Sequence, residues 1–431
     1  MDKNKADIIV VGAGPAGVSA AITAARAGKE VLLVDRSDVA GEKNMFGGAI
    51  YAKQTAEIFP EFWKEAPVER AITEQKIYML TDSDSMQFAY RYASKGAYKA
   101  FSVFRSKWDK WCVEQTKKAG VYYAPKTVVR ELLFKDGHVA GIKTDFEEFY
   151  ADIVILADGV NSLLASQLGL KRELKDEDVT VNVKEVIRLP KERLQDRFNI
   201  DDEDGIAAKI FGGPLKDMFA MGFLYTNKDT VSLGVGVALD ELKKHNLKPY
   251  ELLDELKEHP SIAPLIKDGE VLEYSSHLLP EGRFDTIAKV YDNRVMVVGD
   301  AAGFVNNMHF EGTNLAMLSG KLAGETAVFA IDKGDFSAST LSLYYKKLEN
   351  SIIIKDLKTH NNTIPVLKKN ICTITSLYPN LACEFFELLT AADDIPKAKK
   401  YKKFLEKVIK SGCIQKTIPL GIFAMGKCLK K

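Results

Sequence analysis

The chain has 431 residues, of which 46% are hydrophobic and 28% are charged, and its formal net charge is +1. These values are typical of a soluble globular protein with two or three lobes, and they give no reason to expect a nucleic-acid partner. No uninterrupted apolar run reaches the roughly 18–20 residues that a membrane span needs.

The cysteines are odd in number and no two have C-x-x-C spacing. This pattern argues against a disulfide framework, a zinc site and a four-cysteine iron–sulfur cluster. We therefore expect a cytoplasmic protein with neither a metal nor an iron–sulfur cluster of its own. The five residues are Cys112, Cys372, Cys383, Cys413 and Cys428.

The first predicted elements form a strand–turn–helix–strand unit. Residues 6–11 are a short, branched apolar run typical of a buried parallel strand. A glycine-rich turn follows, then an alanine-rich helix over residues 18–27 that Gly28 ends, and a second apolar strand over residues 30–34. This is the context in which a G-x-G-x-x-G turn binds a dinucleotide.

Each residue of that turn has a predicted task. Gly12 allows the tight turn, Gly14 lets the backbone approach a pyrophosphate, and Gly17 lets the helix pack on the strand. The N–H groups at the start of the helix favour phosphate. Asp35, at the end of the second strand, is expected to accept a hydrogen bond from a ribose hydroxyl. The motif by itself fits either NAD or FAD.

Two later segments favour FAD. Each is a buried strand (residues 151–157 and 293–298) that ends in an acidic residue beside a glycine. The acidic residue after the second strand can bind a ribityl chain, and the helix that follows it stabilises negative charge on a reduced ring. The residues concerned are Asp158, Gly159, Gly299 and Asp300.

This three-part arrangement resembles the glutathione-reductase-type FAD fold. The relevant branch contains aromatic hydroxylases, geranylgeranyl reductases and electron-transfer flavoprotein:quinone oxidoreductases. The resemblance implies that Arg105, at the start of a helix, contacts FAD. It also implies contacts by four further residues: Pro15, Ala16, Arg36 and Val128.

Several segments resemble the quinone oxidoreductases in particular, and especially their short FixC-type branch. They are residues 41–51, 220–237, 259–265, 277–282 and 300–320. The resemblance implies that the first and last of these segments pass beside the flavin. The cofactor residues that it assigns there are Lys43, Asn44, Gly47, Gly48, Gly312, Thr313 and Asn314.

The chain also departs from the family pattern. Glu311-Gly312-Thr313-Asn314 stands where some members have Arg-Gly-Met-Asp, and Met221 replaces a glycine before Gly222. Long members carry a ferredoxin-like domain with a four-iron cluster. The cysteines here do not match it, so the resemblance implies a separate ferredoxin-like subunit.

The predicted fold class is α/β: a discontinuous Rossmann-type FAD domain (1–71, 101–170 and 286–341), an inserted antiparallel-sheet domain for quinone or substrate (72–100 and 171–285), and a helical C-terminal region (342–431). Residues 229–237 have the alternation of an antiparallel strand. Gly222 is the candidate at which a flat quinone ring meets the backbone. His259 and His277 could donate protons, although a structural role is the ordinary one for such histidines.

The last 35 residues are strongly basic. Residues 397–431 hold eleven lysines and one acidic residue, a balance of 11 − 1 = +10. Pro396 is expected to open an amphipathic helix over residues 397–410, and residues 414–425 are apolar. Such a tail suits the inner face of the cell membrane, an acidic ferredoxin-like subunit, or simple packing on the core with a solvated lysine face.

The predicted function is an FAD-dependent oxidoreductase that passes electrons from an electron-transfer flavoprotein to menaquinone or ubiquinone. A separate ferredoxin-like subunit is expected to take part. The alternatives are a geranylgeranyl (prenyl lipid) reductase, a flavin hydroxylase, and an electron-carrier subunit that works only inside a larger flavoprotein complex.

Overall fold

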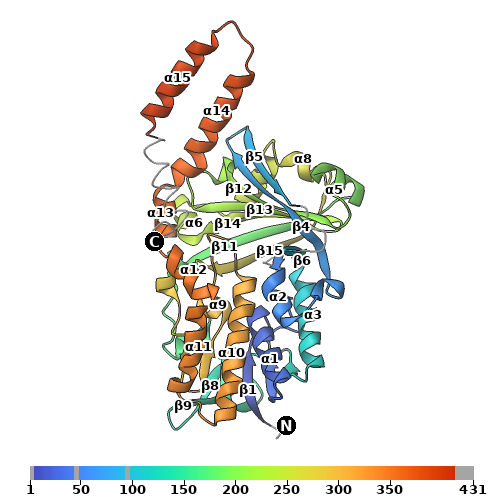
Figure 1. Ribbon diagram of the computed structural model, residues 1–431, viewed down its shortest axis with the longest axis vertical. Coiled ribbons are helices and arrows are strands. Elements are labelled where there is room, and N and C mark those ends of the chain that lie inside the picture. The colour runs from blue at the N-terminus through green and yellow to red at the C-terminus, as the bar shows by residue number, and fades with distance from the viewer. Residues whose placement is uncertain (1–3, 43–47, 93–97, 413–431) are drawn as a thin grey trace. The chain divides into compact units, whose positions relative to one another are not determined.

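The computed structural model describes residues 4–42, 48–92 and 98–412, and it divides the chain into two compact units. Unit 1 comprises Met1–Ala71, Tyr98–Val179 and His277–Asn361. Unit 2 comprises Ile72–Ala97, Thr180–Ser276 and Asn362–Lys431. Each unit has a hydrophobic core cluster of its own, and each is built on a sheet (Figure 1).

The sheet of unit 1 has five parallel strands in the order β17-β10-β1-β2-β7. Their apolar side chains are almost wholly buried because helices cover both faces of such a sheet. An antiparallel strand and an antiparallel hairpin extend it. The strands are β1 (Lys5–Val11), β2 (Val31–Val34), β7 (Tyr122–Ala124), β8 (Val129–Lys135), β9 (His138–Thr144), β10 (Glu148–Leu156), β16 (Tyr291–Asp292) and β17 (Val295–Val297).

Two helices of unit 1 pack unusually closely. α1 (Pro15–Arg26) and α10 (Thr313–Lys333) run side by side (Figure 1). A Cβ added at Gly320 would lie 2.0 Å from the carbonyl oxygen of Ala16, and one at Gly324 would lie 2.7 Å from that of Ala20. Only glycine therefore permits this contact, which holds the start of α10 beside the glycine turn.

The remaining helices of unit 1 surround this core. They are α2 (Ala52–Ile58), α3 (Arg105–Lys118), α4 (Leu163–Gln167), α9 (Gly299–Ala302), α11 (Ala338–Asn350) and α12 (Ile352–His360). Two short strands, β3 (Ala49–Tyr51) and β6 (Ala100–Val103), pair with each other, and β6 also pairs with the first residues of β4 (Val68–Leu80). An aromatic cluster around Phe62 and Trp108 packs between these elements.

The sheet of unit 2 is antiparallel, with the central strands in the order β11-β14-β13-β12. Its strands are β4 (Val68–Leu80), β5 (Ser85–Arg91), β11 (Val179–Arg188), β12 (Asp204–Gly212), β13 (Ala220–Thr226), β14 (Thr230–Ala238) and β15 (Glu270–Pro280). The helices are α5 (Lys191–Phe198), α6 (Leu239–His245), α7 (Pro249–Glu258), α8 (Ala263–Ile266), α13 (Thr363–Lys369), α14 (Tyr378–Thr390) and α15 (Lys397–Lys410).

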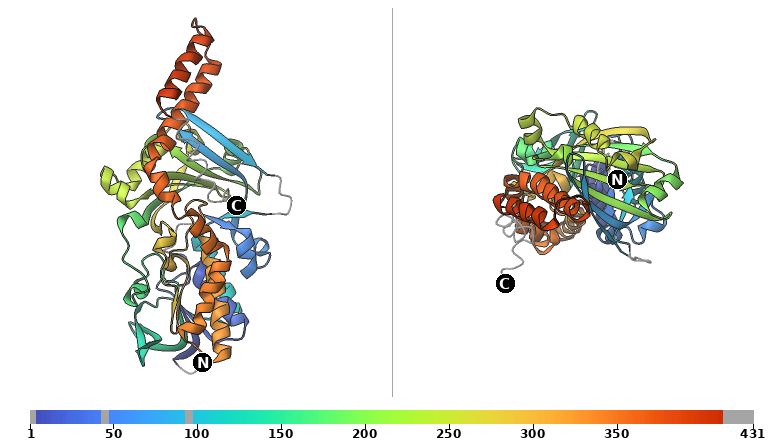
Figure 2. Two further views of the ribbon diagram at one scale, coloured as in Figure 1. Left: turned by 60° about the vertical axis from the view of Figure 1, so that its left-hand side comes forward. Right: turned by 90° about the horizontal axis from the view of Figure 1, so that it is seen from above.

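The described C-terminal part of unit 2 contains a helical pair. α14 and α15 lie side by side in both views (Figures 1 and 2), and the rings of Phe385 and Phe404 join them. No residue of α15 is buried. The mixed α/β fold class, with a parallel sheet, an antiparallel sheet and a helical C-terminal region, is therefore confirmed.

Candidate functional site

The predicted cofactor residues of unit 1 gather at one edge of its parallel sheet. Val11 of β1 is in register with Val34 of β2 and with Leu156 of β10, and Leu156 is in register with Val297 of β17. All four strands therefore end in one row. The residues that follow them, including Gly12, Asp35, Asp158 and Asp300, lie at the carboxyl edge, where α/β sheets bind ligands.

The glycine turn after β1 has the geometry that its sequence predicts. Gly12 has a φ of +106°, and a Cβ there would lie 2.3 Å from the carbonyl oxygen of Ala157. A Cβ at Gly17 would lie 1.8 Å from the carbonyl oxygen of Gly12. α1 begins at Pro15 with Gly14 as its N-cap, and no side chain caps it. Its first N–H groups can therefore face a phosphate.

Asp35 supports this turn directly. Its carboxylate accepts hydrogen bonds from the backbone N–H groups of Ala13 and Ser37, each at 2.8 Å.

The hydroxyl of Tyr123 on β7 is buried, and no hydrogen-bond partner for it exists in the described part of the chain. Burial and then the negative charge of Asp35 raise the pKa of Tyr123 to about 12. Tyr123 is therefore a neutral hydrogen-bond donor at the carboxyl edge of the sheet, on the outermost parallel strand. The sequence motifs did not predict it as a site residue.

Two other predicted residues flank Asp35. Val128 lies in the loop after β7, half-buried, and the neighbouring Thr127 N–H donates to the carbonyl oxygen of Asp35 at 2.8 Å. Arg36 is exposed.

Gly48, from the predicted flavin loop, precedes β3, and its carbonyl oxygen accepts a hydrogen bond from the N–H of Val103 at 2.9 Å. Lys43, Asn44 and Gly47 lie outside the described residues, as does the apolar stretch 414–425.

Arg105 is the first residue of α3 and is largely buried, as is its partner Asp109. Its Nε and Nη2 atoms lie 2.7 and 2.8 Å from the two carboxylate oxygens of Asp109. Burial lowers the pKa of Arg105, but the charges of Asp109 and then Asp300 more than offset this and raise it. Arg105 is thus a fixed positive charge that acts on Asp300.

A second buried cation was not predicted. Lys171 is only 7% exposed, and its ammonium donates to the carbonyl oxygen of Val160 at 2.6 Å. Burial lowers its pKa, while the charges of Asp158 and Asp300 oppose that change. Burial also raises the pKa of Asp158 and of Asp300, against the effect of Lys171. No sequence motif identifies Lys171 as a site residue. It follows a short helix, and its spacing along the chain to Asp158 and to Asp300 is not regular.

The loop before α10 presents two further polar atoms. Gly312 is the N-cap of α10, with Thr313 and Asn314 as its first residues, and no side chain caps the helix. Asn306 and Asn314 are 2% and 1% exposed. Asn306 Nδ2 and Asn314 Oδ1 have no partner in the described part of the chain. Buried polar atoms are rarely left without a hydrogen-bond partner. Asn306 Nδ2 can therefore donate to a bound polar ligand, and Asn314 Oδ1 can accept from one.

Ser162 precedes α4, where its hydroxyl donates to the carboxylate of Asp158 at 3.0 Å and makes no cap hydrogen bond. The surroundings of Gly222 bear on the predicted quinone contact. In unit 2, a Cβ on Gly222 would meet Leu256 at 2.9 Å and Ile210 at 3.0 Å. Apolar side chains already fill the space at Gly222, so a flat ring has no room on that face of the strand.

The two histidines differ in their surroundings. In unit 2, His259 is buried; its Nε2 lies 3.2 Å from the carbonyl oxygen of Thr81, and the N–H of Ser261 donates to its Nδ1 at 3.1 Å. Both ring nitrogens are therefore used structurally. In unit 1, burial and then the charges of Arg105 and Arg36 lower the pKa of His277 to about 4. His277 is neutral at physiological pH.

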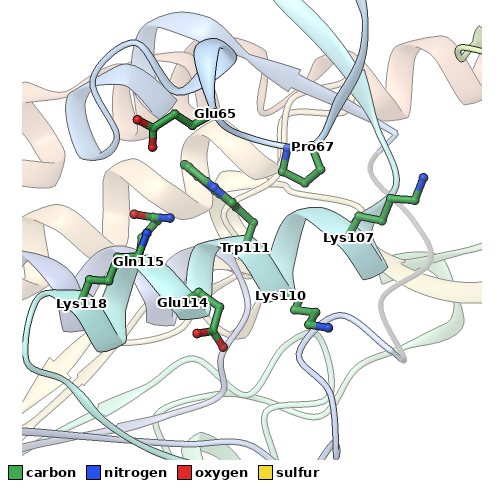
Figure 3. A pocket seen from close by; sticks show the side chains of 8 residues that line it. All are labelled: Glu65, Pro67, Lys107, Lys110, Trp111, Glu114, Gln115 and Lys118. Carbon is green, nitrogen blue, oxygen red and sulfur yellow. The ribbon is translucent and has the colours of Figure 1, made fainter.

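A surface groove of about 610 Å³ lies on the outer side of α3 (Figure 3). The indole of Trp111 is central, with lysines and glutamates around it. None of its lining residues is among the predicted cofactor residues. They are Glu65, Pro67, Lys107, Lys110, Trp111, Glu114, Gln115 and Lys118.

The described residues of unit 1 fit a flavin dinucleotide. The uncapped start of α1 suits a pyrophosphate, and Tyr123 and Asp35 suit the polar groups of a nucleoside. Asn306 and Asn314 offer the donor and acceptor that the edge of a flavin ring requires. Among the described residues, no group of three His, Cys, Asp or Glu side chains could hold a metal ion.

Comparisons with known proteins show the family to which the chain belongs. A family model described as "FAD dependent oxidoreductase" matches residues 7–180, and one described as "ETF-QO, ubiquinone-binding" matches residues 180–279. Protein FixC of Bradyrhizobium diazoefficiens is 38% identical, over 95% of this chain and 96% of that protein. Protein FixC of Azotobacter vinelandii is 40% identical, over 94% of each.

Two further similarities bear on function and fold. The probable electron transfer flavoprotein-quinone oxidoreductase YdiS of Escherichia coli is 38% identical, over 96% of this chain and 97% of that protein. A geranylgeranyl bacteriochlorophyll reductase-like structure from Thermoplasma acidophilum superimposes with a TM-score of 0.72 at 19% identity, over 94% of this chain and 99% of that one, which shows the shared fold. The chain belongs to the FixC-type electron-transfer flavoprotein–quinone oxidoreductase family of FAD-dependent oxidoreductases.

Proposed function

We propose that this protein accepts electrons from an electron-transfer flavoprotein through its FAD and passes them to a quinone. The observation that carries the proposal is the match of residues 180–279 to a ubiquinone-binding model, which falls on the antiparallel sheet of unit 2. The name of the YdiS relative supports the same pair of partners.

The roles of the chain's own residues follow from the site. Bound FAD would supply a ring that accepts and releases electrons. The start of α1 would hold its pyrophosphate, while Asp35 keeps the glycine turn in shape and Arg105 keeps positive charge near Asp300. None of these residues forms a covalent bond to substrate, because electron transfer needs no nucleophile.

We propose the quinone site on one face of the sheet of unit 2. Phe223 of β13 lies over Gly234 of β14, since a Cβ there would lie 2.3 Å from Phe223 Cζ. The ring of Tyr225 is 5.6 Å from that of Phe223, and burial raises the pKa of Tyr225 to about 12. Two neighbouring aromatic rings suit contact with a quinone ring.

A separate ferredoxin-like subunit belongs to the proposal as well. It rests on the spacing of the five cysteines, which does not match a four-cysteine cluster, and on the resemblance to the short branch of the family. Comparing the iron content of the purified chain with that of its native complex would test this part.

We propose that the α14–α15 pair lies on an anionic membrane surface. Its apolar side chains are exposed, and α15 carries seven lysines. Among the described helices, none is long and apolar enough to cross a bilayer. Lipid vesicles with and without phosphatidylglycerol would test it: co-sedimentation only with the anionic vesicles is expected. The exposed residues are Phe385, Phe386, Leu389, Ile395, Leu405 and Ile409.

The relay itself is tested by absorbance spectroscopy of the flavin. Reduced electron-transfer flavoprotein should bleach the flavin bands of the purified protein, and a menaquinone analogue should restore them. Flavin bands that respond to neither partner would refute the relay. Reduction of an isoprenoid double bond by that same preparation would instead indicate a prenyl reductase.

A further inference from the structure

The loop between α9 and α10 ends in a closed turn with a histidine near its tip. Asn306 and Glu311 exchange backbone hydrogen bonds of 2.8 and 3.1 Å, and the N–H of His309 donates to the carbonyl oxygen of Asn306 at 3.2 Å. Phe310 has a φ of +58°, which a bulky side chain adopts only where the surrounding contacts fix the backbone. The turn therefore holds the backbone of His309 in place, although its side chain is exposed.

A second histidine faces His309 from α12. His360 is the last residue of this helix, which is anchored by the buried side chains of Ile353, Ile354 and Leu357. Nδ1 of His360 is buried and has no hydrogen-bond partner in the described part of the chain. Its Nε2 lies 3.3 Å from Nε2 of His309. Two rings that are 51 positions apart in the sequence thus present the same nitrogen to each other.

The distances between the two rings distinguish a shared metal ion from a hydrogen bond. Two imidazoles on a tetrahedral Zn²⁺, with Zn–N bonds of about 2.0–2.1 Å, have their ligating nitrogens about 3.3 Å apart and their ring centroids about 5.2 Å apart. A linear N–H···N hydrogen bond with the same N–N distance would place the centroids about 5.6 Å apart. The centroids of His309 and His360 are 5.0 Å apart, and the angle between the ring planes is 68°. The rings are therefore tilted away from the line that joins the nitrogens, as two ligands of one ion are.

Carboxylates lie near both histidines along the chain. Asp356 precedes His360 by one turn of α12, on the same face of the helix, and Glu311 follows His309 by two residues. Among the described residues, no three His, Cys, Asp or Glu side chains are placed to hold an ion together, so the carboxylates are not direct ligands. They contribute negative charge, which favours a cation, and the remaining positions around the ion are left to water.

We propose that Nε2 of His309 and Nε2 of His360 bind a divalent ion of the zinc class, with water at its other positions. Zinc suits the pair because imidazole nitrogen is one of its preferred ligands and its preferred coordination is tetrahedral. The ion would join the turn before α10 to the end of α12. The spacing of the cysteines could not reveal this site because the site uses no cysteine. The site is also independent of the proposed electron transfer.

Titration of the full chain with Zn²⁺ tests the proposal, with FAD bound and without a polyhistidine tag. Isothermal titration calorimetry should show one Zn²⁺ bound per chain through both histidines. His309→Gln and His360→Gln each leave one of two linked ligands, so we expect roughly hundredfold weaker binding in each variant. His138→Gln, which changes an exposed imidazole on β9, is the matched control and should bind Zn²⁺ as wild type does.

X-ray absorption spectroscopy at the zinc edge gives a second readout that needs wild type alone. Wild type loaded with one equivalent of Zn²⁺ should show only nitrogen and oxygen ligands, at about 2.0–2.2 Å. A cysteine thiolate would instead add sulfur at about 2.3 Å. Among the described cysteines, Cys372 is the exposed one and is therefore the competing ligand that this measurement detects.

The proposal is wrong if wild type binds no Zn²⁺, if both histidine variants bind it as tightly as wild type, or if sulfur appears at the zinc edge. The absorption spectrum decides the matter even if a variant fails to fold. None of these measurements uses electron-transfer flavoprotein or quinone, so failure of the relay would leave their outcome unchanged.

Discussion

The guanidinium of Arg105 and the carboxylate of Asp109 form a two-point ion pair one helical turn apart, with side chains only 10% and 2% exposed. A pair in this setting differs from a surface pair because neither charge can recover its hydration if the other is lost. Its position at the start of α3 links the helix to the carboxyl edge of the sheet through the charge of Asp300.

Asp109→Asn should therefore destabilise unit 1 strongly. Removing one partner of a buried pair leaves an uncompensated charge, so we expect a loss of roughly 3 kcal/mol in the free energy of unfolding. Urea denaturation followed by circular dichroism measures it. Asp145→Asn is the matched control, because Asp145 forms a similar two-point pair with Arg130 at the surface. An equal loss in both variants would contradict the assignment.

Gly320→Ala should separate α10 from α1. Alanine favours a helix, yet its Cβ would lie 2.0 Å from the carbonyl oxygen of Ala16. We expect a net loss of about 2 kcal/mol from overpacking, together with weaker FAD binding, because Ala16 belongs to the glycine turn.

Gly120→Ala is the control for Gly320→Ala, because it introduces backbone strain without a steric clash. Gly120 has a φ of +94° and nothing within 4 Å of an added Cβ. That variant should lose about 1 kcal/mol and bind FAD normally. Normal FAD binding by Gly320→Ala in equilibrium titration would show that the close contact does not support the turn.

His277 should make stability depend on pH. Its pKa in the folded protein is about 4, lowered from 6.5, so between these values the unfolded chain binds a proton that the folded protein does not. Stability should therefore fall as pH falls from 6.5 to 4, by up to about 3 kcal/mol from this residue. Above pH 6.5 the imidazole is neutral in both states and contributes nothing.

His277→Gln should flatten that part of the stability profile, measured by urea denaturation at several pH values. His138→Gln, which changes an exposed imidazole, should leave the profile as in wild type. An unchanged slope in His277→Gln would mean that other groups cause the loss of stability in acid.

Gly234→Ala tests the proposed quinone face. The added Cβ would lie 2.3 Å from the ring of Phe223 and 2.3 Å from the backbone carbonyl oxygen of Val183 on β11, so both the ring and the neighbouring strand must shift. We expect the KM for a quinone analogue to rise about tenfold, a loss of roughly 1.4 kcal/mol in binding. The flavin spectrum and its bleaching by electron-transfer flavoprotein should remain unchanged. An unchanged KM would place the quinone elsewhere.

Local elements were the most predictable part of this protein. The helix expected over residues 397–410 is α15 (Lys397–Lys410), because Pro396 and Gly412 bracket an amphipathic repeat. The apolar runs at residues 6–11 and 30–34 are β1 and β2, and the glycine turn between β1 and α1 follows from its spacing. These features depend on residues within a few positions of one another.

Tertiary structure alone decided the partners of individual side chains. Asp35 faces Ala13, Lys171 acts on Asp158 and Asp300, and Gly222 meets Leu256, although nothing in local spacing links these positions. The physical reason is that strand and helix propensities arise from near neighbours along the chain. Burial and charge depend instead on which distant segments the sheet register and helix packing bring together.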